Sequence, residues 1–169
     1  RKESSAASDV YKRQILLGFG TELLKYKNDE IDDVLACLAK YLEHKNYFII
    51  SSVKDDILRN SELNQKRIVC PYLGETDKTN EDKQWDLYNK WLSGTLAKKL
   101  LVVELGEGFN NPNLIKWPFE RIVMINEKAR FYRIHSMFYQ IPPEIKDKSV
   151  TYKYDAYEVL KTLVNMSNH

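Results

Sequence analysis

Residues 100–105 read LLVVEL and are followed directly by Gly106-Glu107-Gly108. An apolar run of this length that ends in glycine is typical of a strand buried on both faces of a sheet. Residues 15–17 (ILL) lead into Gly18-Phe19-Gly20 in the same way. Strands that are apolar on both faces need a layer of helices on each side, so these two segments predict an α/β protein with a parallel sheet.

Helix-like and strand-like segments alternate through the rest of the chain. Apolar residues between positions 31 and 42 recur at helical spacing, while residues 47–51 (YFIIS) and 68–69 indicate further buried strands. The remaining segments are predicted as a loop (74–83), a helix with an aromatic face (85–96), two strands (121–125, RIVMI, and 130–134, RFYRI) and a terminal helix (154–164). Together they predict a three-layer, Rossmann-like parallel sheet with helices on both faces.

The composition of the 169-residue chain indicates one folded domain, because 43% of the residues are hydrophobic. Residues 1–14 (RKESSAASDVYKRQ) lack a hydrophobic period, so we expect a disordered or foreign segment there and a domain over 15–169. The rest of the chain holds 22 basic and 22 acidic residues, which disfavours a nucleic-acid partner. Its apolar runs fall well short of the ~18 residues of a membrane span, so no membrane partner is expected. Two cysteines and no apolar secretory segment favour a cytoplasmic location.

Two glycine turns mark the predicted ligand-binding edge of the sheet. Ligands of open parallel sheets bind at the carboxyl ends of the strands, where glycine lets the backbone approach a phosphate. Tight β-to-α turns would use the same glycines, so both interpretations stay open. Position 23 is Leu where a dinucleotide fingerprint has its third glycine, and neither turn is followed by Gly-Lys-Ser/Thr. These differences disfavour a dehydrogenase or a P-loop kinase.

Several segments together resemble the sirtuin family, NAD-dependent protein deacylases with a Rossmann-like large domain, and in particular its divergent bacterial branch. The segment with the most specific resemblance is 105–120 (LGEGFNNPNLIKWPFE), followed by 122–126 (IVMIN). Residues 16–22 (LLGFGTE), 47–58 (YFIISSVKDDIL) and 67–69 extend it over about residues 15–140. The resemblance implies NAD or ADP-ribose as the cofactor and an acylated or ADP-ribosylated protein as the substrate.

The resemblance also implies roles for individual residues. The first glycine turn would face the pyrophosphate, the second would line the adenosine side, Asn126 would hydrogen-bond the adenosine ribose, and Asp55 would orient the substrate pocket. The implied cofactor-binding residues are Gly18, Phe19, Gly20, Thr21, Glu22, Ser51, Ser52, Gly106, Glu107, Gly108, Phe109, Asn110 and Asn126.

The catalytic half departs from the sirtuin pattern. Val53 stands where sirtuins place an Asn on the nicotinamide ribose, and residues 69–74 (VCPYLG) lack the His that acts as general base. His135, which follows a predicted strand, is a secondary candidate for a ligand contact. Only Cys70 lies where sirtuins hold paired cysteine ligands, so neither zinc nor the small zinc lobe is expected.

Three functions are compatible with this pattern. The chain is an NAD-dependent deacylase or ADP-ribosyl transferase, a catalytically inactive module that binds NAD or ADP-ribose, or a truncated sirtuin-like fragment.

Overall fold

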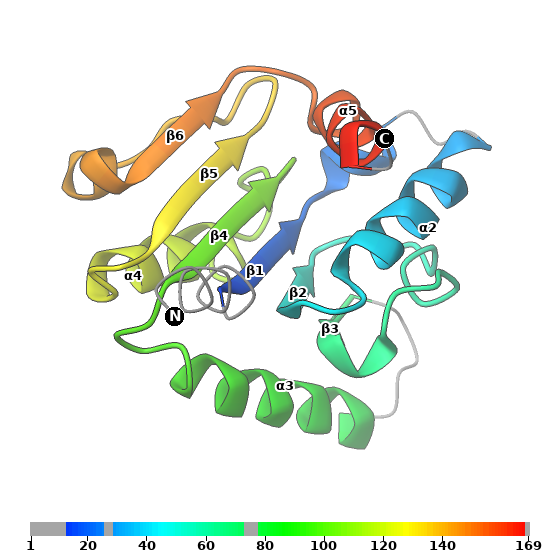
Figure 1. Cartoon of the computed structure of the whole chain (residues 1–169), viewed down its shortest axis with the longest axis horizontal. Helices are drawn as coiled ribbons and strands as arrows, with labels where there is room; N and C mark the ends of the chain where they lie inside the picture. The colour runs from blue at the N-terminus through cyan, green and yellow to red at the C-terminus, as the bar shows by residue number, and fades with distance from the viewer. Residues whose placement is uncertain (1–12, 26–28, 73–77, 168–169) are drawn as a thin grey trace, which may run out of the picture.

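The computed structural model of the chain describes residues 13–25, 29–72 and 78–167. Six parallel strands form one sheet in the order β3-β2-β1-β4-β5-β6 (Figure 1). The strands are β1 (Gln14–Phe19), β2 (Asn46–Ser51), β3 (Ile68–Val69), β4 (Leu100–Leu105), β5 (Arg130–Ile134) and β6 (Ser149–Tyr152). Strands β1 to β3 are added in one direction across the sheet, and strands β4 to β6 are added in the other direction. This is the strand order of a Rossmann-type sheet, so the predicted fold class is confirmed.

Helices cover the sheet on both faces. In the view of Figure 1, α2 (Glu30–Leu42) and α5 (Ala156–Ser167) lie in front of the sheet and α4 (Lys116–Ile125) lies behind it. The helix α3 (Lys78–Ser93) packs on the same face as α4. Connections between parallel strands are right-handed. The connection from β1 to β2 and those from β3 to β4 and β4 to β5 cross the sheet in opposite directions, so their helices lie on opposite faces. Three short 3₁₀ segments complete the fold: η1 (Thr21–Leu24), η2 (Gln65–Arg67) and η3 (Pro143–Lys148).

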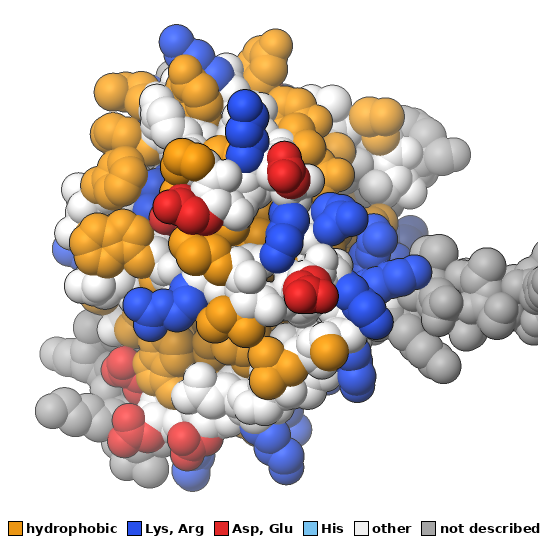
Figure 2. Space-filling view, turned by 90° about the vertical axis from the view of Figure 1, so that its left-hand side faces the viewer, with side chains coloured by type: hydrophobic (Ala, Val, Ile, Leu, Met, Phe, Trp, Pro, Cys, Tyr) orange, Lys and Arg blue, Asp and Glu red, His pale blue; other side chains and the backbone are white. Residues whose placement is uncertain are grey.

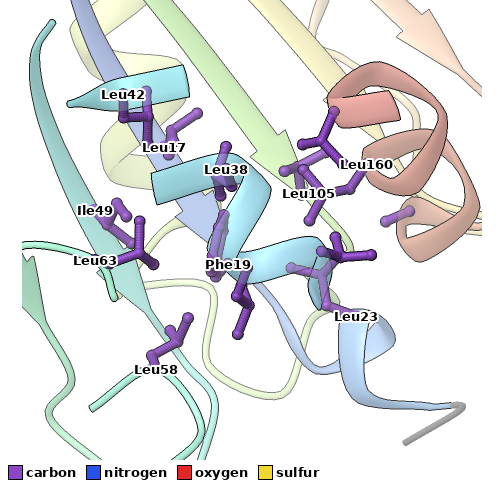
Figure 3. Packing of buried hydrophobic residues seen from close by; sticks show 14 of the residues in the cluster. Leu17, Phe19, Leu23, Leu38, Leu42, Ile49, Leu58, Leu63, Leu105 and Leu160 are labelled. Carbon is purple, nitrogen blue, oxygen red and sulfur yellow. The ribbon is translucent and has the colours of Figure 1, made fainter. Parts of the chain in front are cut away.

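Two apolar cores lie on the two faces of the sheet. Alternate residues of β1 enter them, Leu17 with the helices α2 and α5, and Leu16 with α3 and α4. Figure 3 shows the first core, in which Leu38 of α2 approaches the sheet and Leu160 of α5 lies beside Leu105 of β4. None of the described helices is long and apolar enough to cross a lipid bilayer.

Residues 121–125 form the end of α4, so the prediction of a strand there was wrong. Phe119 and Val123 are fully buried and four positions apart, while Met124 and Ile125 are 45% and 65% exposed. This is the pattern of an amphipathic helix. The four apolar residues that follow Arg121 fit a strand or a helix, and here packing on the back of the sheet selects the helix.

Other segments also differ from the predictions. The helix α3 begins at Lys78, so residues 78–83 are helical rather than a loop, and the rest of that predicted loop lies outside the described residues. The strand β1 begins at the buried Gln14, while residues 1–12 lie outside the described part. The edge strand β6 was not predicted. Figure 2 looks onto the side of the molecule that bears this strand and shows hydrophobic side chains interspersed with charged ones.

The two glycine turns touch each other at the carboxyl edge of the sheet. The Gly20 N–H donates to the Leu105 carbonyl (2.8 Å), and the Glu22 N–H donates to the Gly106 carbonyl (3.1 Å). A Cβ atom at Gly20 would lie 2.1 Å from the Gly106 oxygen. Gly106 itself has φ +71°, a conformation that favours glycine. Glycine at position 20 is therefore required by a main-chain contact between the two turns.

We expect Gly20→Ala to destabilise the protein by about 2–3 kcal/mol, because the new methyl group meets backbone rather than a movable side chain. Urea unfolding measures this change. Gly108→Ala is the matched control, since its Cβ would meet only Phe138, at 3.6 Å, and we expect a small effect there. Equal losses in the two variants would contradict this account.

Candidate functional site

Strands β1 and β4 are neighbours in the sheet, but the chain continues from β1 to α2 on the front face and from β4 to α4 on the back face. Such a switch point is where open α/β sheets bind ligands. The structure brings the two predicted turns together here, with Gly20, Thr21 and Glu22 from the first and Gly106, Glu107 and Gly108 from the second. The expectation that the two turns converge at one edge is thus met for these residues.

The first glycine turn is engaged in contacts within the protein. The N–H groups of Gly20, Glu22 and Leu23 donate to protein carbonyls, so they are already bonded. Gly18 lies inside the sheet, where a Cβ would come within 2.8 Å of Ile115 and Phe119 on the back face. Close packing within the protein therefore accounts for the presence of glycine at positions 18 and 20.

Glu22 anchors the first turn to the other end of the chain. Its carboxylate accepts hydrogen bonds from the backbone N–H and the hydroxyl of Ser136, and from the N–H of Ala156 at 2.9 Å. Ala156 begins α5, and a carboxylate is favourable at the N-terminus of a helix. The side chain is 7% exposed, so Glu22 acts here as a structural link between β1, β5 and α5.

His135 occupies the carboxyl end of β5, next to Glu22. Its Nδ1 accepts hydrogen bonds from the N–H groups of Met137 and Phe138, both at 2.9 Å. Burial lowers the pKa of His135, although Glu22 Oε2, 3.3 Å from Nδ1, opposes this shift. A neutral ring that accepts at Nδ1 carries its proton on Nε2. His135 therefore provides a polar side chain at the carboxyl end of β5, the strand next to β4. The sequence analysis predicted Asn126 at this place.

Asn126 lies at the opposite edge of the sheet. It follows α4 rather than a strand, and its Nδ2 donates to the carbonyls of Thr95 and Lys98, both at 3.1 Å. Those carbonyls precede β4, so they mark the amino edge of the sheet. Its Oδ1 accepts from the Lys128 N–H. The expectation that Asn126 joins the glycine turns was wrong, because the segment before it is a helix.

A buried ionic network lies directly behind the switch point. Glu104 of β4 is fully buried, and its carboxylate accepts from Lys116 Nζ at 2.8 Å. Arg133 of β5 donates to the two oxygens of the same carboxylate at 3.0 and 2.9 Å, in the bidentate geometry that favours strong pairing. Lys116 and Arg133 are each 1% exposed. The Glu104 carboxylate therefore neutralises part of the positive charge of the two buried cations.

The same cations hold the neighbouring loops. Lys116 Nζ also donates to the carbonyls of Glu107 and Phe138, both at 2.8 Å. Arg133 donates to the Gln140 carbonyl at 2.7 Å and to Glu120 at 3.3 Å. The sequence analysis missed this network, although a charged residue within each of the apolar strands LLVVEL and RFYRI is its signal.

Glu107 is the buried carboxyl group at the switch point itself. It is 3% exposed, and its Oε2 has no hydrogen-bond partner in the described structure. Burial raises the pKa of Glu107 to about 7, and the charge of Glu104 adds to this, while hydrogen bonds from Ser52 and Gly108 and the charge of Lys116 oppose it. An unsatisfied buried oxygen of this kind is suited to accept a hydrogen bond from a ligand.

The loops after β3 and β4 carry aromatic and amide side chains. Tyr72, after β3, and Asn111, after β4, form a hydrogen bond that joins the two halves of the sheet. Phe109 is 51% exposed, and its ring meets that of Phe138 edge-on at 5.2 Å. Asn110 is exposed beside it. The second turn therefore presents an accessible aromatic face and a polar side chain.

The remaining predicted residues have separate environments. Ser51 is fully buried and its hydroxyl accepts from the Val53 N–H at 3.0 Å. Asp55 accepts from the Ile57 N–H and lines an open cavity of about 760 Å³ with Asp29, Asp32, Asp56 and Glu62. No residue of the two glycine turns lines that cavity. Burial raises the pKa of the Cys70 thiol, so it is a poor nucleophile. The described residues contain no cluster of three potential metal ligands.

We expect Glu104→Gln to destabilise the protein by about 3–5 kcal/mol, because it leaves two buried cations without their shared carboxylate. Urea unfolding near neutral pH measures the loss. The double variant Glu104→Gln with Lys116→Met removes one of those cations and should recover part of the stability. A double variant that loses as much as the sum of the two single variants would contradict the pairing.

The raised pKa of Glu107 predicts a pH-dependent stability. Between the ordinary pKa of 4.5 and about 7 the folded protein binds more protons than the unfolded chain, so stability falls as the pH rises through this range. Glu107→Gln removes the ionised form and should be more stable than the parent by up to about 3 kcal/mol near pH 8, with little difference near pH 5. Urea unfolding at the two pH values tests this. Glu127→Gln, at an exposed position, is the control. A stability difference between Glu107→Gln and the parent that is the same at both pH values would argue against a raised pKa of Glu107.

Comparison with known proteins gives a distant similarity. No protein-family model matches the chain. A protein ADP-ribosyltransferase from Staphylococcus aureus (strain Mu50 / ATCC 700699) is 27% identical over 90 residues. The match covers 53% of this chain and 29% of that protein, so the chain spans less than a third of the length of the relative. The chain is thus distantly similar to part of a protein ADP-ribosyltransferase.

Proposed function

We propose that the chain is a sirtuin-like domain that binds ADP-ribose or NAD at the switch point, between the ends of β1, β2 and β4. The observation that carries the proposal is the buried Glu107 carboxyl group, whose Oε2 lacks a hydrogen-bond partner there. A ribose hydroxyl donates to such an oxygen, and Ser52 lies within hydrogen-bond reach of the same carboxyl group. The distant similarity to an ADP-ribosyltransferase supports this ligand class.

The residues at this edge fit the ribose better than the pyrophosphate. Two carboxylates, Glu22 and Glu107, stand near the first turn, and its Gly20 and Glu22 N–H groups are bonded within the protein. Negative phosphates are therefore disfavoured over that turn. At Gly108 an added Cβ would meet only side-chain atoms at ordinary contact distance, so a ligand can approach its backbone. Phe109 offers an exposed ring on which an adenine base can stack.

Binding without turnover is the function that these residues support best. NAD, when bound, supplies an ADP-ribosyl group through cleavage of its nicotinamide bond. A histidine that acts as general base, as in sirtuins, needs a free lone pair near neutral pH. His135 already accepts two hydrogen bonds at Nδ1, which leaves Nε2 as a donor. Asp55 lies in a different cavity, so the proposed catalytic role for it has no support from the turns.

ADP-ribosyl transfer or deacylation is the second candidate, and the similarity to a transferase favours it. Nicotinamide release separates the two candidates. The binding module predicts saturable binding of NAD with no nicotinamide released at high protein concentration, with or without an acylated peptide. Release that depends on the peptide would establish an enzyme instead.

Calorimetry with ADP-ribose and NAD tests the proposed site. We expect Glu107→Gln to weaken ADP-ribose binding about tenfold, the effect of losing one hydrogen bond to a charged group. Affinity should rise between pH 6 and pH 8 for the parent, as Glu107 ionises, and stay flat for this variant. Phe109→Ala should weaken binding about fivefold through loss of stacking, roughly 1 kcal/mol.

Tyr41→Ala is the matched control for Phe109, because Tyr41 is 47% exposed on α2 and lies outside the proposed site. We expect it to bind as the parent does. Identical melting curves with and without saturating ADP-ribose and NAD would rule out the proposed ligand class, since a ligand that binds only the folded state must stabilise it.

A further inference from the structure

An apolar groove lies on the front face of the sheet, away from the proposed nucleotide site. We call it the front groove. Its volume is about 720 Å³. Its floor comes from β4, β5 and β6, and one wall comes from α5. The groove is lined by Leu101, Val103, Tyr132, Ile134, Tyr152, Tyr154, Asp155, Glu158, Val159, Thr162 and Leu163.

The topology explains why this face is open. The connections from β4 to β5 and from β5 to β6 run through α4 and η3, which pack on the back face. Right-handed crossovers in this direction cannot place a helix in front. In Figure 1 the front of β5 and β6 is accordingly not crossed by a described helix, whereas α2 covers the front of the β1 side. Within the described part of the chain, the front groove is the region of the sheet that no helix covers.

The exposed residues of the groove include three large hydrophobic side chains, with Glu158 and Thr162 exposed beside them. Tyr152, Tyr154 and Leu163 are 41%, 65% and 50% exposed. Contiguous apolar surface of this kind, with a polar rim, marks an interaction site. A helix is about 10 Å across and rises about 1.5 Å per residue, so a half-embedded helix of roughly three turns fills such a volume.

The charge of the groove specifies the chemistry of that helix. Asp155 and Glu158 are the ionisable acids of the lining, and they lie together at the start of α5. Among the residues that the structure describes, no lysine or arginine lines the groove, and the neighbouring Lys161 pairs with Glu30 on α2. From this complementarity we propose that the front groove binds an amphipathic helix of a partner protein, with an apolar stripe on the strands and lysine or arginine residues against Asp155 and Glu158.

A model peptide tests the proposal with the whole chain. The probe is a fluorescent amphipathic peptide of about 14 leucine and lysine residues. We expect saturable binding in fluorescence anisotropy. Tyr152→Asp and Leu163→Asp should each weaken it at least about tenfold, as for central apolar contacts, and Glu158→Lys should weaken it about fivefold. Since the apolar sites are already partly exposed, the variants should fold, and thermal unfolding checks this.

Three controls decide the outcome. Met124→Asp alters an equally exposed apolar residue on α4 and should bind the peptide as the parent does. The peptide with glutamate in place of lysine, and the lysine peptide with a central proline, should bind at least about tenfold more weakly. Equal binding of these peptides, or no effect of the groove variants, would overturn the proposal. Self-association of the chain that Leu163→Asp abolishes would show that a second copy occupies the groove and would overturn it as well.

Discussion

The buried carboxylate of Glu104 is the constraint on which the carboxyl edge of the sheet at the switch point depends. It lies between Lys116 of α4 and Arg133 of β5, and all three side chains are almost wholly removed from water. Isolated charges in this position would be strongly destabilising, so each member keeps the others in place. Because the two cations also bind the carbonyls of residues 107, 138 and 140, the loops after β4 and β5 are fixed to α4 as one unit.

The parts of the fold that could be read from the sequence are those in which local pattern and tertiary packing agree. The apolar segments that became β1 and β2 are buried on both faces, and β4 is buried on its back face and half-buried at Leu101 and Val103 on its front face, so the composition of these segments alone identifies them as strands. Residues 121–125 are different, because their side chains suit a strand and a helix equally well. Only the back face of the sheet, which takes up Phe119 and Val123 from one side of a helix, decides between the two. The misplacement of Asn126 follows from that one error.

The candidate site was predictable in outline. Two glycines after apolar strands were enough to expect that the turns meet at one edge, and Gly20 and Gly106 do meet. The sequence pattern did not reveal that these glycines allow the main chains of the two turns to contact each other directly. The structural role of Glu22 also escaped prediction, since its partners, His135, Ser136 and Ala156, are distant from it in the chain. Such long-range polar contacts leave no periodic signal in a sequence.

The contact between Gly20 and Gly106 divides the rim of the sheet into a fixed half and a variable half. Position 20 admits no side chain without displacing the main chain of its neighbour. Phe109 and Asn110 are exposed, and a Cβ atom at Gly108 would meet only the Phe138 side chain at ordinary contact distance. A combinatorial library built on this edge should therefore randomise Phe109 and Asn110 and keep Gly20, because any side chain at position 20 would destabilise the fold.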